Sequence, residues 1–364
     1  MQNITFVTGI YDLGKRENNP NRRQISDYLQ HGNFLLSQDI NLYIFCDPEL
    51  EPYIKSKRKY DDKTVLIPIP FEEWDLFPIQ SKIISASLLN PVQNHNPFKD
   101  TPLYFLVMWL KFAMLRHAIK DNTFNSTHFA WIDYGITHVA NCKYVVKDQI
   151  FTKVSEKVKV LMLKNWADND LKDIRAFLSI RRGLLGCGFM TGNKENMKKF
   201  SKLFLEKALE LLEQGYASTD EALLPYVIKD NPDLFDLYYG DYEAIFSNYR
   251  VHRGSMYCTL LTLITSREAK DWKRGCDVGK RVLESYNDGT LESSDGELSQ
   301  VLDEYYIAAF YLQNMALARE IAETYKKIAL SKPSFREVYL RNKNHIDSNF
   351  SFLPNFSMNI SKSS

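Results

Sequence analysis

The sequence is poor in cysteine, carries almost no net charge and lacks a long apolar run. Its five cysteines among 364 residues form no Cys-x-x-Cys pair, which argues against a disulfide framework or a zinc knuckle and favours a reducing compartment. The most apolar run, residues 103–110, ends at Lys111 and is much shorter than the roughly 18 to 20 residues of a membrane span. Lys and Arg number 46 against 45 Asp and Glu, so no global charge favours binding to nucleic acid.

The first residues, MQNITFVTGIYD, contain no basic segment followed by a long apolar one. We therefore expect no signal peptide, no integral membrane segment and a cytoplasmic protein. The hydrophobic fraction of 45% and the charged fraction of 25% are typical of a globular chain. Aromatic residues make up 13%, enough for a large core and for a surface that contacts sugars.

Familiar phosphate-binding and nucleophile motifs are also missing. No Gly-x-Gly-x-x-Gly follows the first predicted strand, and the glycines of residues 186–192 have the wrong last spacing. The sequence contains neither Gly-x-x-x-x-Gly-Lys-Ser/Thr nor Gly-x-Ser-x-Gly. A dinucleotide-binding fingerprint, a P-loop NTPase and a serine hydrolase of the common type are therefore not expected.

Short apolar runs alternate with amphipathic stretches in the first part of the chain. Strands are predicted at 4–8, 42–46, 65–69 and 129–132, with helices at 25–36 and 103–120 between them. Further strands are expected at 158–163 and 183–192, followed by a helix at 196–214 that Gly215 ends. This alternation predicts the α/β class, with a mostly parallel sheet covered by helices.

The last third of the chain has a different pattern. Residues 255–330 are almost entirely helical in pattern, with breaks at 287–296 and near Gln313, and the end of the chain is rich in Ser and Asn. We therefore predict an α/β domain at 1–254, a helical extension at 255–345, and a tail at 346–364 that is either disordered or lies along the surface.

Ligands of an open parallel sheet bind at the carboxyl ends of its strands, so the residues after each strand are the first candidates. Thr8, Gly9 and Tyr11 come at the end of the first strand, where a glycine allows close approach and a tyrosine ring can stack on a base. An ordinary tight exit from a strand explains the same residues.

The segment Trp131-Ile132-Asp133-Tyr134-Gly135 places a carboxylate directly after an apolar strand. Such a carboxylate suits Mg²⁺ or Mn²⁺ that bridges two phosphates, although an aspartate that caps a turn has the same pattern. His138 and His252 are either further ligands or partly buried histidines. The Asp-x-Asp at 168–170 lies in a polar loop and is expected to be a solvated turn.

Two more segments carry candidate charges. Ser218 and Glu221 fit a capping box at the start of a helix, which leaves Asp220 as the freer acid to act on a sugar hydroxyl as general base or anchor. Lys111 is a lone cation on the apolar helix before Asp133, where a solvent-facing position is the default and a phosphate contact is the alternative.

Four motifs, FVTGIYDLGKR, LYIFCDPEL, TPLYFLVMWLKFAMLRHAI and STHFAWIDYGITH, occur in an order that resembles the bacterial HtrL/YibB family. This family is grouped with the WlaTC proteins as candidate glycosyltransferases, and the match spans roughly residues 4–249. The resemblance implies a GT-A-like fold that uses a nucleotide-diphosphate sugar as donor and a glycan or glycoconjugate as acceptor, in a hexosyltransferase-type reaction of glycan biosynthesis.

The resemblance also implies roles for particular residues. Thr8, Gly9 and Tyr11 would line the nucleotide, Asp133 would be the first acid of an Asp-x-Asp motif, and Gly135 stands where the second acid is usual. A bound Mn²⁺ or Mg²⁺ would then need another ligand, such as His138 or His252.

By the same resemblance, Gly188 and Phe189 would border the transferred sugar, and Asp220 and Glu221 would lie beside the acceptor. Lys111 and Arg16 are cations that could neutralise the departing diphosphate.

Two other functions share these features. A degenerate transferase domain could bind a sugar nucleotide or a protein partner through the helices at 298–330, and an exposed apolar stripe on these helices would favour it. A nucleotidyltransferase or sugar-nucleotide hydrolase would use the same donor site without an acceptor cleft.

Overall fold

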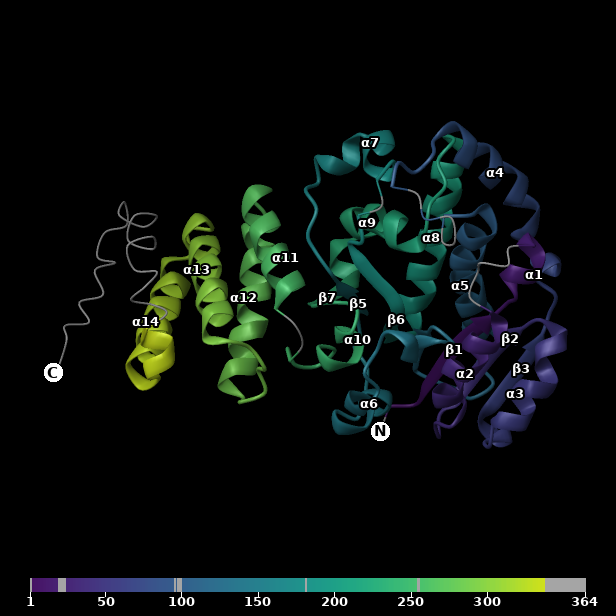
Figure 1. Cartoon of the computed structure of the whole chain (residues 1–364), viewed down its shortest axis with the longest axis horizontal. Coiled ribbons are helices and arrows are strands. Elements are labelled where there is room, and N and C mark those ends of the chain that lie inside the picture. Colours follow the sequence, from purple (N-terminus) through teal and green to yellow (C-terminus); the bar gives the residue numbers. More distant parts are fainter. Residues whose placement is uncertain are drawn as a thin grey trace. The chain divides into compact units, whose positions relative to one another are not determined.

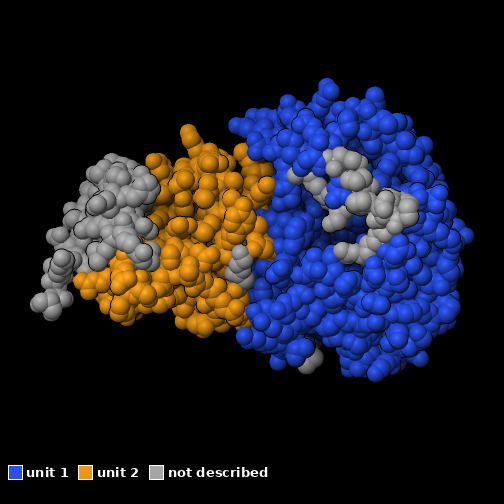
Figure 2. All heavy atoms as spheres, in the orientation of Figure 1, with its two compact units in different colours: residues 1–163, 168–238, 242–250 blue, residues 164–167, 239–241, 251–364 orange. Residues whose placement is uncertain are grey.

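The structure, a computed structural model, describes residues 2–18, 24–94, 96, 100–180, 182–253 and 256–337. The chain forms two compact units, shown in different colours in Figure 2. Unit 1 comprises residues 1–163, 168–238 and 242–250, and unit 2 comprises residues 164–167, 239–241 and 251–364. None of the described helices combines the length and the apolar character needed to cross a bilayer. The tail predicted at 346–364 lies outside the described residues.

Unit 1 is built on a seven-stranded sheet of order β3-β2-β1-β4-β6-β5-β7 (Figure 1). Strand β1 is parallel to its neighbours β2 and β4, and β2 is parallel to β3, whereas β6 runs antiparallel to both β4 and β5. The strands are β1 (Ile4–Ile10), β2 (Asn41–Cys46), β3 (Thr64–Pro68), β4 (His128–Ile132), β5 (Val158–Met162), β6 (Leu185–Asn193) and β7 (Phe235–Tyr239).

Helices cover the sheet, so its central strands are buried on both faces. All five residues of β4 are buried, and β2 is buried from Leu42 to Cys46, as expected of strands whose sequences are continuous apolar runs. The helices of unit 1 are α1 (Leu13–Glu17), α2 (Ile25–Leu36), α3 (Glu51–Lys57), α4 (Gln80–Leu89), α5 (Pro102–Asp121), α6 (Lys143–Lys147), α7 (Ile174–Leu178), α8 (Lys194–Glu213), α9 (Asp220–Asp230) and α10 (Ala244–Ser247).

The two longest helices of unit 1, α5 and α8, pack against each other. The rings of Phe112 and Phe204 stack with their centroids 3.6 Å apart. Helix α5 begins where Thr101 Oγ1 accepts a hydrogen bond from the Tyr104 amide, with Pro102 in its first turn. This cap fixes where α5 starts, and with it the height of each side chain above the sheet.

The strand order creates a topological switch point between β1 and β4. The chain moves outward from β1 to β2 and β3, and then returns to place β4 on the other side of β1. In open α/β sheets, ligands bind in the crevice outside the carboxyl ends of the two strands at such a point. Tyr11 follows β1 and Asp133 follows β4, so both residues lie at this edge of the sheet.

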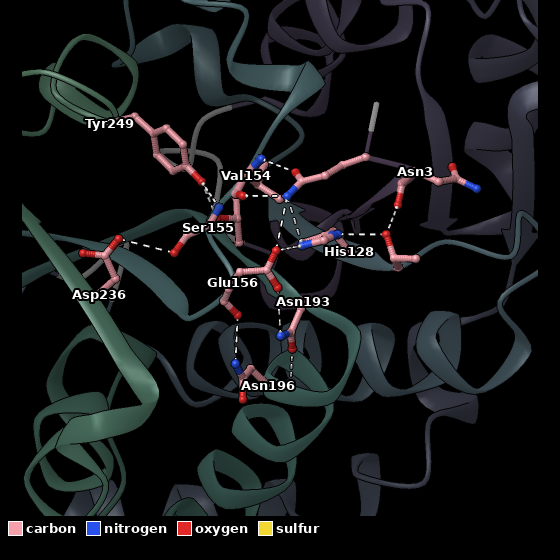
Figure 3. A network of polar contacts seen from close by, with 12 residues as sticks. Asn3, His128, Val154, Ser155, Glu156, Asn193, Asn196, Asp236 and Tyr249 are labelled. Atoms are coloured by element: carbon pink, nitrogen blue, oxygen red, sulfur yellow. Dashed lines mark hydrogen bonds and ion pairs between the residues drawn. The ribbon is translucent and has the colours of Figure 1, made fainter.

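A polar network connects strand ends on the side of the sheet away from the switch point (Figure 3). At the amino end of β4, His128 Nε2 lies 3.0 Å from Glu156 Oε1, and Asn193 Nδ2 donates to the other oxygen of Glu156. The backbone carbonyl of Glu156 accepts from Asn196 Nδ2 at 2.8 Å. This network joins β4, β6 and the start of β5, and it accounts for these polar residues without a ligand.

The predicted α/β class with a helical C-terminal region is confirmed, and the predicted strands are present with small shifts at their ends. The helix expected at 25–36 has these bounds, and Gly215 follows α8 with a φ of +86°. The reversed direction of β6 was not predicted. Strand β7 was missed because FDLYY is short, and α4 was missed because it has only two buried residues, Ile83 and Ala86. The short helices of seven residues or fewer were also missed, namely α1, α3, α6, α7 and α10.

The described residues of unit 2 form four helices, α11 (Tyr257–Glu268), α12 (Trp272–Asn287), α13 (Asp295–Tyr311) and α14 (Met315–Ser331). The breaks predicted at 287–296 and near Gln313 separate them. Helices α12 and α13 approach closely through two glycines of α12. A Cβ atom on Gly279 would lie 2.2 Å from Tyr305 Cγ, and one on Gly275 would lie 2.8 Å from Ala308 Cβ.

The contact between α12 and α13 gives a testable prediction. Gly279→Ala forces a methyl group into the Tyr305 ring, so we expect the free energy of unfolding of unit 2 to fall by about 1 to 3 kcal/mol. The matched control is Gly296→Ala, in the first turn of α13, where an added Cβ meets no atom within 4 Å and helix propensity favours alanine. Urea denaturation of both variants checks this, and equal stabilities would contradict the close packing.

Candidate functional site

Three charged side chains meet at the carboxyl end of β4. Lys111 Nζ lies 3.1 Å from Asp133 Oδ1 and 3.0 Å from Asp220 Oδ2. The three residues come from the middle of α5, the end of β4 and the first residue of α9. The side chains of Lys111 and Asp220 are 5% and 2% exposed, whereas that of Asp133 is 36% exposed. We call these three residues the ion triad, and Asp133 is the member that reaches the solvent.

Helix α5 explains why the lysine is buried. Every residue from 102 to 115 is buried or half-buried, so a lysine in the middle of this segment has no polar face to occupy. The expectation that Lys111 faces the solvent is therefore wrong. Two tryptophans hold the carboxylates that pair with Lys111. Trp109 Nε1 donates at 2.9 Å to the carbonyl of Ser218, which lies just before α9, and Trp131 Nε1 donates to Asp133 Oδ1 at 2.7 Å.

The electrostatics of the triad follow from this burial. Burial alone would lower the pKa of the Lys111 ammonium, but the carboxylates of Asp133 and Asp220 outweigh it and hold this pKa well above its ordinary value. Burial raises the pKa of Asp220, although the nearby ammonium acts in the opposite direction. Lys111 is therefore a permanent cation.

Gly188, on β6, contacts the exposed acid. Its carbonyl accepts from the Asp133 amide at 2.8 Å, and a Cβ atom at this position would lie 3.2 Å from Asp133 Oδ2 and 2.9 Å from Ile136 Cδ1. Phe189, in contrast, is completely buried, with its ring 5.2 Å from Phe246. Core packing accounts for Phe189, so its position gives no support to a contact with the sugar.

The start of α9 differs from the prediction. Its N-cap is Thr219, which makes no side-chain capping hydrogen bond, so the capping box expected between Ser218 and Glu221 is wrong. Asp220 is 1% exposed and is not the freer acid, because the lysine of the neighbouring helix needs a buried partner. Glu221 is the half-buried acid of the pair, and its Oε1 accepts from Tyr242 Oη at 2.6 Å.

The residues that end β1 are mainly packing residues. Thr8 is completely buried. A Cβ atom on Gly9 would lie 2.5 Å from Met114 Sδ, so the end of the methionine side chain of α5 packs directly on this glycine. Tyr11 is 8% exposed, its hydroxyl accepts from Trp74 Nε1 at 2.7 Å, and its ring packs on Phe71. No free ring face for a base is apparent from this packing.

Arg16 is held by carboxylates from two neighbouring strand ends. Its guanidinium makes two hydrogen bonds to Asp47, of 2.8 and 2.7 Å, and two to Glu72, of 2.7 and 3.1 Å. It also lies over the Phe71 ring. Because two acids already compensate this cation, the structure offers a local explanation for Arg16 that needs no diphosphate.

The residues considered as metal ligands have separate surroundings. His252 belongs to unit 2, where its amide donates to Ser285 Oγ and its Nε2 lies 3.3 Å from Thr259 Oγ1. His138 Nδ1 lies 2.6 Å from the Gly135 carbonyl, and residues 168–170 are exposed as expected. Within the described part of the chain, no group of three or more His, Cys, Asp or Glu side chains is placed to hold a metal ion.

The site thus joins Lys111, Asp133, Asp220 and Gly188, while Glu221 comes next to Asp220 in the chain. Sequence reasoning missed both Trp indoles and the Tyr242 hydroxyl bound to Glu221. One signal was available for Lys111, since an apolar segment on all sides of a helix leaves a lysine no route to water. No comparable signal in the sequence points to Tyr242.

Comparison with known proteins assigns the family. Residues 2–253 match the HtrL_YibB family, described as a bacterial protein of unknown function. The chain belongs to the HtrL_YibB family. Protein HtrL of Escherichia coli (strain K12) is 24% identical over 264 residues, which cover 69% of this chain and 93% of HtrL. The resemblance inferred from the four motifs is therefore confirmed.

Two solved structures are similar to this chain over about two thirds of its length. Mouse xyloside xylosyltransferase 1, in its apo form, matches 64% of this chain and 84% of its own, with 10% identity and a TM-score of 0.34. The 4-diphosphocytidyl-2C-methyl-D-erythritol synthase of Anaerococcus prevotii DSM 20548 matches 67% of this chain and 90% of its own, with 11% identity and a TM-score of 0.32. Likeness at this level carries no argument about activity.

The ion triad gives a prediction about stability. Lys111→Met removes the cation and leaves Asp220 buried beside Asp133, so we expect a loss of about 3 to 5 kcal/mol at neutral pH. Native Asp220 then keeps a proton that the unfolded chain releases above about pH 4, so the free energy of unfolding of the variant should fall as the pH rises. Urea denaturation at several pH values measures both effects.

The double variant Lys111→Met/Asp220→Asn is the control for this prediction. It removes the uncompensated carboxylate, so part of the stability should return and the added pH dependence should disappear. A Lys111→Met protein with the stability and the pH profile of the unchanged chain would contradict the ion triad.

His252 gives a prediction of opposite sign. Burial lowers its pKa to about 4, so unfolded His252 takes up a proton below about pH 6.5 and the native residue does not. Unit 2 should therefore lose about 3 kcal/mol through this residue as the pH falls from 6.5 to 4. Compared with the unchanged chain, His252→Gln should not show this loss. The comparison separates the effect of His252 from that of Asp303, whose pKa burial raises to about 8, because Asp303 is present in both proteins. Identical pH profiles would contradict the prediction.

Proposed function

We propose that this HtrL_YibB chain is a glycosyltransferase that moves a sugar from a nucleotide-diphosphate donor to a glycan or glycoconjugate acceptor. The observation that carries the proposal is the ion triad at the switch point of the sheet. A buried lysine between two carboxylates is costly to maintain, and this one fixes an exposed carboxylate where open α/β sheets bind their ligands.

In this proposal Asp133 contacts the donor. A carboxylate accepts hydrogen bonds only, so it suits the hydroxyl groups of a ribose or a sugar. Trp131 Nε1 and Lys111 Nζ both bind its Oδ1, which fixes the orientation of the side chain. Gly188 places no side chain against Oδ2, since a Cβ atom there would lie 3.2 Å from this oxygen. Such fixed geometry is how a transferase lowers the barrier to a step between two bound substrates.

Glu221 is the candidate general base toward the acceptor hydroxyl. It is half-buried and its carboxylate is oriented by Tyr242, whereas Asp220 is shielded from solvent by its position against Lys111. Asp220 is therefore proposed as a positioning residue that holds Lys111. The acids thus have different tasks, although they are adjacent in the sequence.

The rival function, a protein-binding module that uses helices 298–330, has less support. The apolar stripe of α13 is buried at Leu298, Val301, Leu302 and Tyr305, and that of α14 at Ile321 and Ile328. These helices use their apolar faces to pack within unit 2. A hydrolase that shares the donor site would release free sugar in the absence of an acceptor, which makes it an outcome of the activity test.

Thermal unfolding in the presence of a panel of nucleotide sugars, with and without Mn²⁺, tests the proposal. At a hundred times its dissociation constant, a donor adds about 2.7 kcal/mol of stability, and we expect at least one donor to raise the melting temperature. Asp133→Asn keeps the shape of the side chain but removes its charge, so it should lower the affinity for this donor at least tenfold.

A matched control for this experiment is Asp168→Asn, in the exposed loop that also resembles an Asp-x-Asp motif, which should bind the donor as the unchanged chain does. If no nucleotide sugar of the panel raises the melting temperature, the result counts against the transferase. Equal donor affinities for Asp133→Asn and Asp168→Asn would remove Asp133 from the site.

A further inference from the structure

We infer that the ammonium group of Lys111 occupies the place of a divalent cation between Asp133 and Asp220, so that the site works without a bound metal. This role of Lys111 depends only on the ion triad. That a nucleoside diphosphate also binds here without Mn²⁺ or Mg²⁺ rests on the proposed function.

The geometry is that of a cation shared by two acids. One oxygen of each carboxylate lies within 3.1 Å of the same nitrogen, and an ammonium has three N–H donors to direct at such oxygens. The nitrogen belongs to a side chain that is 5% exposed and that is covalently part of α5. The cation between the two carboxylates is therefore part of the fold.

The donor set does not fit a metal in addition to the lysine. Asp133 Oδ1 already accepts from Trp131 Nε1, and Asp220 Oδ1 accepts from the Glu221 amide at 3.0 Å. A dication between these carboxylates would have to displace the ammonium, because two positive centres at this separation repel each other strongly where water is excluded. Mg²⁺ also demands near-octahedral geometry at about 2.0 to 2.1 Å from its ligands.

The ligands expected from the resemblance do not supply an alternative. Gly135 stands in place of a second acid, and His252 makes its own contacts in unit 2. The positive charge that the two acids share comes from Lys111. The chain therefore differs from an Asp-x-Asp site in the source of its positive charge.

If Lys111 takes the place of a cation, its removal should create a metal site. Lys111→Ala leaves the two carboxylates facing the space that the lysine side chain fills. Lys111→Met removes the same charge but fills the space with a thioether. Lys111→Ala/Asp220→Asn has the space but only one of the two carboxylates.

The experiment titrates each protein with Mn²⁺ alone and follows free Mn²⁺ by electron paramagnetic resonance. We expect Lys111→Ala to bind one Mn²⁺ at least tenfold more tightly than the unchanged chain, and Lys111→Met and Lys111→Ala/Asp220→Asn to show no such gain. Mn²⁺ should also raise the melting temperature of Lys111→Ala more than that of the other proteins. Folded Lys111→Ala that gains no affinity for Mn²⁺ overturns the inference.

A second measurement does not depend on the folding of a lysine variant. The unchanged chain is titrated with Mn²⁺ beside Asp133→Asn, and both should leave the free Mn²⁺ signal the same. One tightly bound Mn²⁺ that Asp133→Asn abolishes would overturn the inference. Because no nucleotide sugar is present, these results are independent of the test for transferase activity, and either proposal can fail while the other stands.

Discussion

The buried ammonium of Lys111 needs negative charge beside it, and this need organises unit 1. Lys111 lies on a helix segment without a polar face, so it is stable only if acids are brought to it from elsewhere in the chain. One acid comes from the end of β4 and the other from the first residue of α9. The same requirement thereby fixes the packing of three elements and the orientation of Asp133. Structural and functional demands on these residues cannot be separated.

Local patterns in the sequence were sufficient for most elements of the fold. Continuous apolar runs such as 42–46 and 129–132 predicted buried strands, and the glycine after residues 196–214 predicted the end of a helix. The reversed direction of β6 could not be predicted in this way, because parallel and antiparallel buried strands have similar composition. Strand β7 was missed since five residues give too short a pattern to distinguish.

The site was predicted in part, and the failures have a common cause. The position of Asp133 was predicted because a carboxylate that directly follows a strand lies at the carboxyl end of that strand whatever surrounds it. The roles of Asp220, Gly9 and Arg16 depend on partners far away in the sequence, namely Lys111, Met114 and the pair of Asp47 and Glu72. A capping box was expected at Ser218 because only neighbouring residues were considered. Tertiary contacts decided each of these positions.

The place of β5 in the sheet bears on how the chain is made. Both neighbours of β5, namely β6 and β7, come after it in the sequence. During synthesis, residues 158–162 therefore leave the ribosome before either pairing partner exists, with both hydrogen-bonding edges open. An unpaired apolar strand is a hazard for aggregation. Nascent chains that end between β5 and β6 expose this unpaired strand and should therefore bind chaperones.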